Sequence, residues 1–176
     1  MKNIIEHKFI QMKLTELIAG HITAVHEGGN WTEVNIKDTL ANVGYKEAST
    51  VTKASYNTIA ALLHHLSFYN DIVMQRLSGA NPVISEANGF DMPPVKNEED
   101  WIKLKERNLE SAQQLTEAVR HFPEERLNEL TATGHATHYK TLHGIVEHAH
   151  YHLGQIVLLK KLIMQTKAPA AKSNSL

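Results

Sequence analysis

Four long segments of this chain carry apolar residues at helical spacing, and no other feature constrains the fold as strongly. In the first of them, Ile18, Ile22 and Val25 recur at intervals of four and three residues, which is the spacing of one helix face. No stretch shows a convincing period of two residues, as a half-buried strand would. The pattern predicts helices over about residues 3–26, 55–79, 97–121 and 139–165. We therefore predict an all-α fold, a four-helix bundle.

The predicted helix ends carry residues that commonly start and stop helices. We expect Ser55 to cap the second helix and Gly79 to end it. Asn97 opens the third helix and is followed by acidic residues, which suit the positive end of a helix dipole. We predict a single bundle domain over residues 1–166 and a flexible tail over residues 167–176.

Two connections between the helices have a distinct composition. The stretch "NWTEVNIKDTLANVGYKEAS" predicts a loop with one or two helical turns. Its Trp31 is interpreted either as a plug over the end of the bundle, which we favour, or as a pocket wall. The stretch Ala80–Pro94, "ANPVISEANGFDMPP", predicts a long surface loop and allows a long crossover between the second and third helices. Loops on rigid scaffolds usually carry specificity, so we expect substrate contacts from this loop and from Trp31.

The composition argues against several classes of function. The net charge of −1 gives no electrostatic reason to bind nucleic acid or an anionic membrane. The chain has no cysteine, which excludes disulfides and thiolate ligands, so any thiol chemistry must use a thiol from outside. The first residues, "MKNIIEHKFI", carry charges through their apolar pattern and do not resemble a signal peptide. No apolar run is long enough to span a membrane, and we expect a cytoplasmic protein.

The stretch "EHAHYHLGQI" in the last predicted helix places three histidines within five positions. At about 100° per residue, His148 and His152 lie on the apolar face and point into the bundle. His150 and His143 fall on roughly the opposite side, where we expect solvent. Two inward imidazoles without partners are costly to desolvate. The pair is therefore either a hydrogen-bonded core pair or part of a metal site, and its spacing alone leaves both open.

The second predicted helix offers a third imidazole in the stretch "LLHHLSFY". By helical phase His65 lies at the edge of the apolar stripe, whereas His64 points away and is expected on the surface. Facing helices of a bundle are where metal ligands are built. Neutral imidazoles at His65, His148 and His152 would leave a fourth position open, as in a catalytic zinc site.

Other catalytic motifs find no support in the sequence. Ala149 follows His148 at the position where an H-E-x-x-H metalloprotease needs its glutamate. The chain has no G-x-S-x-G, G-x-G-x-x-G or Walker motif, which argues against the corresponding nucleophile and nucleotide chemistry. It also has no inward Glu-x-x-His pairs on two helices, which a di-iron carboxylate bundle needs.

The stretches "TIAALLHHLSFYNDIV" and "HAHYHLGQI" together resemble the DinB-like superfamily of four-helix bundles, which includes the DinB/YfiT-like metalloenzymes. The family pattern has one histidine in the second helix and H-x3-H-x-G-Q-I in the last. These positions match His65, His148 and His152. The stretch "GGNWTEVNIKDTLANV" also resembles the segment that follows the family's first helix. The resemblance covers about residues 5–165, and the last-helix motif is its specific part.

The resemblance implies a divalent metal ion, usually zinc or nickel, on those three histidines. Members with known activity include thiol-dependent S-transferases and isomerases that use low-molecular-weight thiols such as bacillithiol or mycothiol. We therefore predict a metal-dependent enzyme of the thiol S-transferase or hydrolase type, in which the ion activates a small thiol or water. The alternative is a non-catalytic bundle that binds a metal or a small ligand, as a sensor or stress-response protein. The resemblance also implies a homodimer.

Three residues beside the motifs also receive a predicted role. Gln155, in the turn after His152, is interpreted as an orienter of a metal ligand, as a substrate contact or as an ordinary polar residue. Tyr69 and Tyr151 are expected to pack against their neighbours rather than to act in catalysis.

Overall fold

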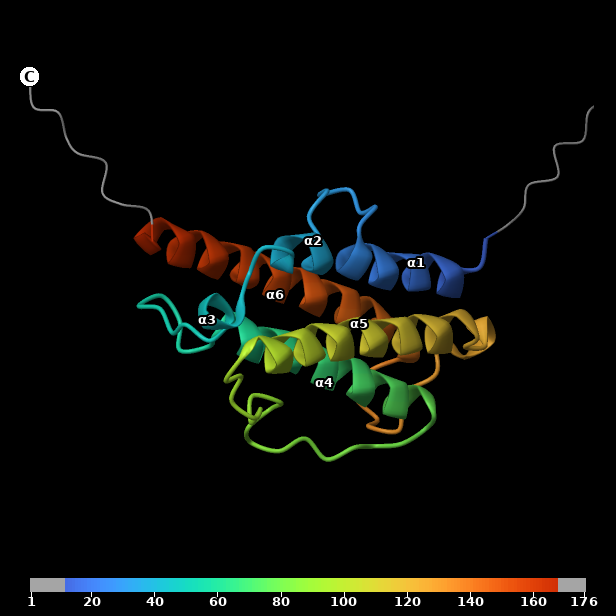
Figure 1. The fold of residues 1–176 in the computed structure, drawn as a ribbon. Helices are drawn as coiled ribbons and strands as arrows, with labels where there is room; N and C mark the ends of the chain where they lie inside the picture. The colour runs from blue at the N-terminus through green and yellow to red at the C-terminus, as the bar shows by residue number, and fades with distance from the viewer. Residues whose placement is uncertain (1–11, 168–176) are drawn as a thin grey trace, which may run out of the picture.

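Six α-helices and one short 3-10 helix make up the described part of the chain, in a computed structural model that describes residues 12–167 (Figure 1). The long helices are α1 (Leu14–Glu27), α4 (Ile59–Leu77), α5 (Glu98–Arg120) and α6 (His138–Lys167). The short ones are α2 (Ile36–Leu40), α3 (Tyr45–Ala48) and the 3-10 helix Glu124–Arg126. No β-strand occurs within residues 12–167, so the prediction of an all-α helical bundle is confirmed.

The ends of α4 are set by local hydrogen bonds and backbone conformation. Thr58 caps the helix, because its hydroxyl accepts a hydrogen bond from the backbone N–H of Ala61. Ser55, the predicted cap, lies in the preceding turn, where its hydroxyl accepts from the N–H of Asn57. At the other end Gly79 has a φ of +88°, which favours glycine, and the helix stops before it as predicted.

The first and last helices have other bounds than the sequence predicted. The first helix begins at Leu14, because Lys13 has extended backbone angles. The predicted helical residues 3–11 lie outside the described residues. At the other end Lys167 still belongs to α6, and residues 168–176 of the predicted tail also lie outside the described part.

The long helices pack as a bundle in which α4 and α5 run in the same direction (Figure 1). Helix α1 packs against α5 and α6, and α4 packs against the same two helices. Because α4 and α5 are parallel neighbours, residues 80–97 must return along the bundle, and they form the predicted long crossover. Helix α5 then begins after Asn97 as predicted, since the side-chain oxygen of Asn97 accepts a hydrogen bond from the N–H of Asp100 at 2.9 Å.

Two hydrophobic clusters fill the bundle, one toward each end of its long helices. One includes Leu63 and Trp101, and the other includes Leu115 and Leu142. Along α4 and α5 the two clusters are separated by buried polar side chains that hydrogen-bond to one another, namely Ser67, Asn70, Asn108 and Ser111. These hydrogen bonds satisfy polar groups that would otherwise be costly to bury. The middle of the bundle therefore accommodates polar side chains.

The two tryptophans occupy opposite environments. Trp31 is 97% exposed, so its prediction as a plug over the bundle end is wrong. It follows Gly28 and Gly29, whose φ values of +115° and +89° turn the chain away from the end of α1. Trp101 is fully buried, and its Nε1–H donates a hydrogen bond to the carbonyl of Val43 at 2.7 Å. The buried aromatic plug is therefore Trp101, near the start of α5.

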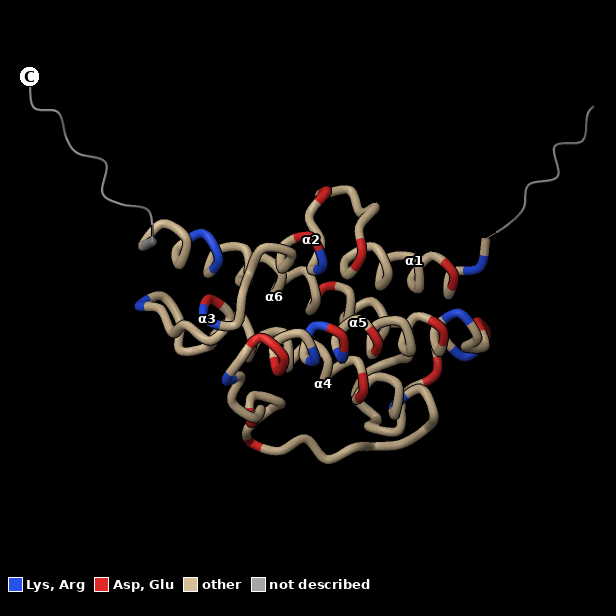
Figure 2. Tube along the Cα trace, viewed as in Figure 1, with Lys and Arg blue, Asp and Glu red and all other residues tan. Residues whose placement is uncertain are grey.

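Charged residues are unevenly distributed over the helices (Figure 2). Helix α4 carries no charged residue between Ile59 and Asn70, and α6 carries none between His148 and Leu159. These two stretches pack against each other through their apolar residues. The space between them is therefore poor in fixed charge. Within residues 12–167, no helix combines the length and apolar character needed to cross a membrane.

Candidate metal centre

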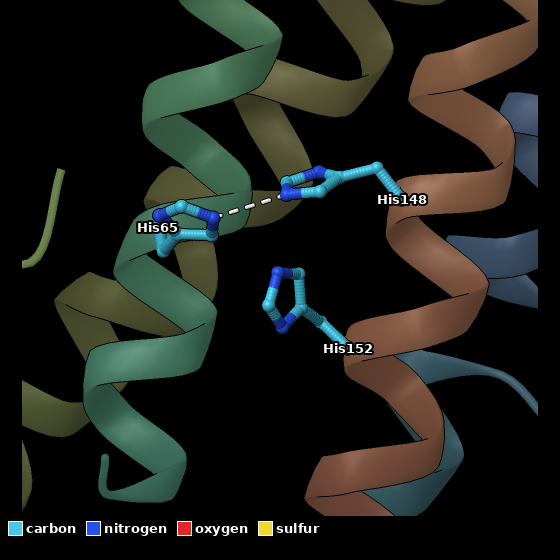
Figure 3. Close-up of side chains that lie close together, drawn as sticks. All are labelled: His65, His148 and His152. Carbon is cyan, nitrogen blue, oxygen red and sulfur yellow. Dashed lines mark hydrogen bonds between the residues drawn. The ribbon is translucent and has the colours of Figure 1, made fainter. Parts of the chain in front are cut away.

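Three histidines from two helices meet between α4 and α6 (Figure 3). His65 reaches from α4, while His148 and His152 reach toward it from successive turns of α6. One ring nitrogen of each lies within 4.8 Å of the other two, and the Nε2 atoms of His65 and His148 are 3.0 Å apart. The structure thus brings together the three residues that were predicted as metal ligands, and they form a group that could hold a metal ion.

The adjacent histidines of α4 lie in different surroundings. His65 is 3% exposed and faces α6. His64 was expected in solvent, but it is half-buried, and its Nδ1 lies 3.0 Å from the carbonyl oxygen of Gly89. The reason is that the crossover segment packs over the outer side of α4. Helical phase alone cannot reveal such a cover, because it describes one helix without its neighbours.

The other histidines of α6 do not join this group. His143 is exposed, as predicted. His150 is half-buried rather than solvated, and it lines a surface cavity of about 340 Å³ together with His21 and Trp31. Trp31 is therefore a cavity wall, the less favoured of its two interpretations. None of the three inward histidines lines this cavity.

The crossover segment holds His65 in place. The Nδ1–H of His65 donates a hydrogen bond to the carbonyl of Asn88 at 2.8 Å. Asn88 has a φ of +51°, in the left-handed region that asparagine tolerates better than most residues. Gly89 follows with a φ of +75°, and a Cβ there would lie 2.5 Å from Cδ1 of Phe68. The turn therefore depends on its glycine, and it presents the Asn88 carbonyl to the imidazole.

Two hydrogen bonds determine which ring nitrogens carry protons. A carbonyl oxygen only accepts, so Nδ1 of His65 carries the proton and its Nε2 keeps a lone pair. The Nδ1 of His152 lies 2.7 Å from Oε1 of Gln155 and donates to it, so its Nε2 also keeps a lone pair. Such a hydrogen bond at the far nitrogen is the usual way in which a metal-binding histidine is oriented.

The remaining imidazole, His148, has a freer choice of tautomer. Its Nδ1 is buried and has no hydrogen-bond partner among residues 12–167. With the proton on Nε2, His148 donates to Nε2 of His65, so the metal-free alternative is a hydrogen bond between α4 and α6 and not one between the predicted pair His148 and His152. With the proton on Nδ1, three Nε2 lone pairs face one another, and that arrangement requires a cation. Tetrahedral zinc with bonds of about 2.0–2.1 Å places nitrogens roughly 3.3 Å apart, so the three residues fit such an ion.

The three imidazoles are neutral at pH 7. The pKa of His148 is lowered to about 4, chiefly by burial and further by the neighbouring imidazoles of His152 and His65. Burial also lowers the pKa of His65 and of His152, against the hydrogen bonds to Asn88 and Gln155 that raise them. The facing stretches of α4 and α6 carry no carboxylate that would favour the protonated rings. Neutral imidazoles keep the lone pairs that a metal ion needs.

Aromatic rings close around His65. The ring of Phe90 stacks on it, with centroids 4.2 Å apart and 12° between the planes. The ring of Tyr69 lies 4.9 Å from both His65 and His148, and its hydroxyl donates to Oδ1 of Asn88 at 2.5 Å. Sequence reasoning missed Asn88 and Phe90. The stretch "ANGF" indicates a turn, but no local pattern shows that the turn docks on a histidine.

A comparison with known protein families identifies the family of this chain. The model of the DinB superfamily matches residues 22–156, which is more than half of the chain. The chain belongs to the DinB superfamily. The matched range contains both histidine stretches, "TIAALLHHLSFYNDIV" and "HAHYHLGQI", so the resemblance drawn from these residues is confirmed. A search of curated proteins and a search of solved structures each returned no significant match.

The DinB-superfamily match also covers two residues that flank the histidines of α6. Gln155 is half-buried and hydrogen-bonded to His152, which favours its interpretation as an orienter of that ring. Tyr151 was expected to pack. Its ring lies 5.0 Å from that of His152, but it is 64% exposed, so it covers the outer edge of the group without entering the core.

Proposed function

We propose that His65, His148 and His152 bind one divalent metal ion, zinc or nickel, and that this DinB-superfamily chain is a metal-dependent enzyme. The observation that carries the proposal is the convergence of three neutral imidazoles within 4.8 Å, in a part of the bundle that is poor in charge. A divalent ion bound there lowers the pKa of a thiol or a water and so supplies a nucleophile near neutral pH. The reaction is thiol S-transfer or hydrolysis, with a low-molecular-weight thiol as the favoured small-molecule substrate.

The chain's own residues orient and shield the ligands. The Asn88 carbonyl and the Gln155 side-chain oxygen hold the rings of His65 and His152 with their Nε2 lone pairs inward. Phe90 covers one face of the His65 ring and keeps water from it. The chain has no cysteine, so a reacting thiol comes from solution and no thiol of this chain competes for the ion.

One observation favours a non-catalytic role as the second candidate. The hydrogen bonds of the three imidazoles among the described residues go to one another, to a backbone carbonyl and to an amide oxygen. No carboxylate, which is a common general base, takes part. A bundle of this kind binds a metal ion or a small ligand as a sensor or a stress-response protein. Assays with and without metal separate the two candidates.

The purified chain should contain about one divalent ion per molecule, measured by elemental analysis, because three preformed neutral ligands hold an ion firmly. A panel of small thiols and electrophiles should then show turnover that a chelator abolishes and that zinc or nickel restores. A bound ion without turnover on any pair would support the non-catalytic candidate. A chain that takes up no zinc or nickel at all would contradict the proposed metalloenzyme and leave only the binding of a small ligand.

Replacing Gln155 with alanine should weaken metal binding by about 10–100-fold, because a partner that orients a ligand typically contributes that much to affinity. The affinity is measured by competition with a chromophoric chelator. Gln165→Ala, at an exposed position of the same helix, is the matched control and should leave the affinity unchanged. Equal affinities in the two variants would show that Gln155 does not orient His152.

A further inference from the structure

A second cavity lies on the other side of the bundle, between α1, α2, α4 and α5. Its volume is about 280 Å³, and none of the three inward histidines lines it. Half of its ten lining residues are apolar, namely Ile36, Leu40, Ala41, Leu63 and Leu109. Small-molecule sites in proteins typically combine such a lining with a few polar groups. An engineered apolar cavity of about 150 Å³ holds benzene, so this one has room for a substituted ring.

One polar side chain in this lining lacks a hydrogen-bond partner. His26, in the last turn of α1, is 3% exposed and lines the cavity. Its Nδ1–H donates to the carbonyl of Ile22 at 2.9 Å, on the same helix. The opposite nitrogen, Nε2, therefore carries a lone pair. Nε2 is buried and has no partner among the described residues. Burial lowers the pKa of His26, so the ring stays neutral and its Nε2 accepts a hydrogen bond.

The charges of the cavity lie at its rim and are of both signs. Lys37 and Glu106 are exposed, and the half-buried Lys105 places its Nζ 5.5 Å from the centroid of the Trp101 ring. The other uncharged polar lining residue, Asn108, already donates to Oγ of Ser67 at 3.2 Å. The interior therefore offers no net charge to an ion, and its unpaired group is an acceptor.

We propose that this cavity is a second ligand site, which binds a small neutral molecule with an apolar ring and one hydroxyl donor, such as a phenol. The hydroxyl donates to Nε2 of His26, and the ring lies among the apolar side chains between Leu63 and Leu109. The site is independent of the proposed metal centre, and it goes beyond the proposed function.

The test compares p-cresol with p-xylene, which have nearly the same shape but differ in a hydroxyl and a methyl group. Binding to the full chain is measured by NMR titration. The wild type should bind p-cresol about tenfold more tightly, because p-xylene leaves the buried acceptor unpaired. In His26→Leu the preference should disappear or reverse, whereas His143→Leu, at an exposed position, should keep it. Equal binding of the two compounds by the wild type, or a cresol preference that survives in His26→Leu, would overturn the proposal.

A second measurement needs no variant at position 26. In wild-type chain with ¹⁵N-labelled histidine, p-cresol should shift the Nε2 resonance of His26, while p-xylene should leave it in place. Leu109→Trp adds a larger side chain at the half-buried edge of the cavity and should abolish the binding of both compounds. A cresol shift confined to His65, His148 or His152 would instead place the compound at the proposed metal centre and overturn the second site.

Discussion

Replacing His148 with alanine should reduce bound metal from about one ion per chain to less than about a tenth of an ion, measured by elemental analysis after dialysis. His148 is the central donor of the group, since its Nε2 lies 3.0 Å from that of His65 and its ring centroid lies 4.5 Å from that of His152. Two remaining imidazoles cannot complete a three-ligand site. The facing stretches, residues 59–70 and 148–159, carry no carboxylate that could replace His148 as a ligand.

His143→Ala is the matched control, because His143 lies on the same helix but is exposed. It should leave the metal content at the wild-type level. Metal should also stabilise the wild type against thermal unfolding, by about 4 kcal/mol when the free ion is at 1,000 times its dissociation constant. This stabilisation should vanish in His148→Ala. Unchanged metal content and unchanged metal-dependent stability in His148→Ala would show that the ion binds elsewhere.

Replacing Trp101 with alanine should lower the free energy of unfolding by about 3–5 kcal/mol, measured by chemical denaturation. Trp101 is fully buried in a cluster to which all six α-helices contribute, and the substitution leaves a large cavity there. It also removes the donor for the carbonyl of Val43, which the indole N–H reaches at 2.7 Å. A loss of this size is a large part of the stability of a typical domain.

Trp31→Ala tests the same substitution at the exposed tryptophan. Because Trp31 is 97% exposed, its replacement should change the free energy of unfolding by less than about 0.5 kcal/mol. Trp101→Phe separates packing from hydrogen bonding, since it keeps an aromatic ring but leaves the Val43 carbonyl without its donor. Similar losses for Trp31→Ala and Trp101→Ala would contradict the burial of Trp101.

The inward histidines could be predicted from sequence because a helix imposes its own geometry. Four residues after His148, His152 must lie on the same face, and the apolar residues identify that face as the inner one. The same rule separated His65 from His64 on α4. The rule depends only on residues within one helix, so it needed no knowledge of the packing around it.

The features that could not be predicted depend on how loops dock. Trp31 and Trp101 are both large and apolar, and only the path of the chain after Gly28 decides which one is buried. The partial burial of His64 and the contact of Asn88 with His65 both arise because the crossover segment folds back over α4. Contacts between segments far apart in sequence leave no local periodicity to detect.

The turn at Asn88 and Gly89 restricts which insertions and substitutions the crossover segment can accept. Surface loops usually tolerate insertions and substitutions. Residues 80–84 precede this turn, whose backbone hydrogen bonds begin at the Ser85 carbonyl, and they are free to vary in length provided that they still span the bundle. The turn itself is not, because one inserted residue would replace the Asn88 carbonyl opposite His65, and any side chain at Gly89 would meet Phe68. A loop that looks like a spacer in the sequence is therefore constrained at this turn by the histidine that it holds.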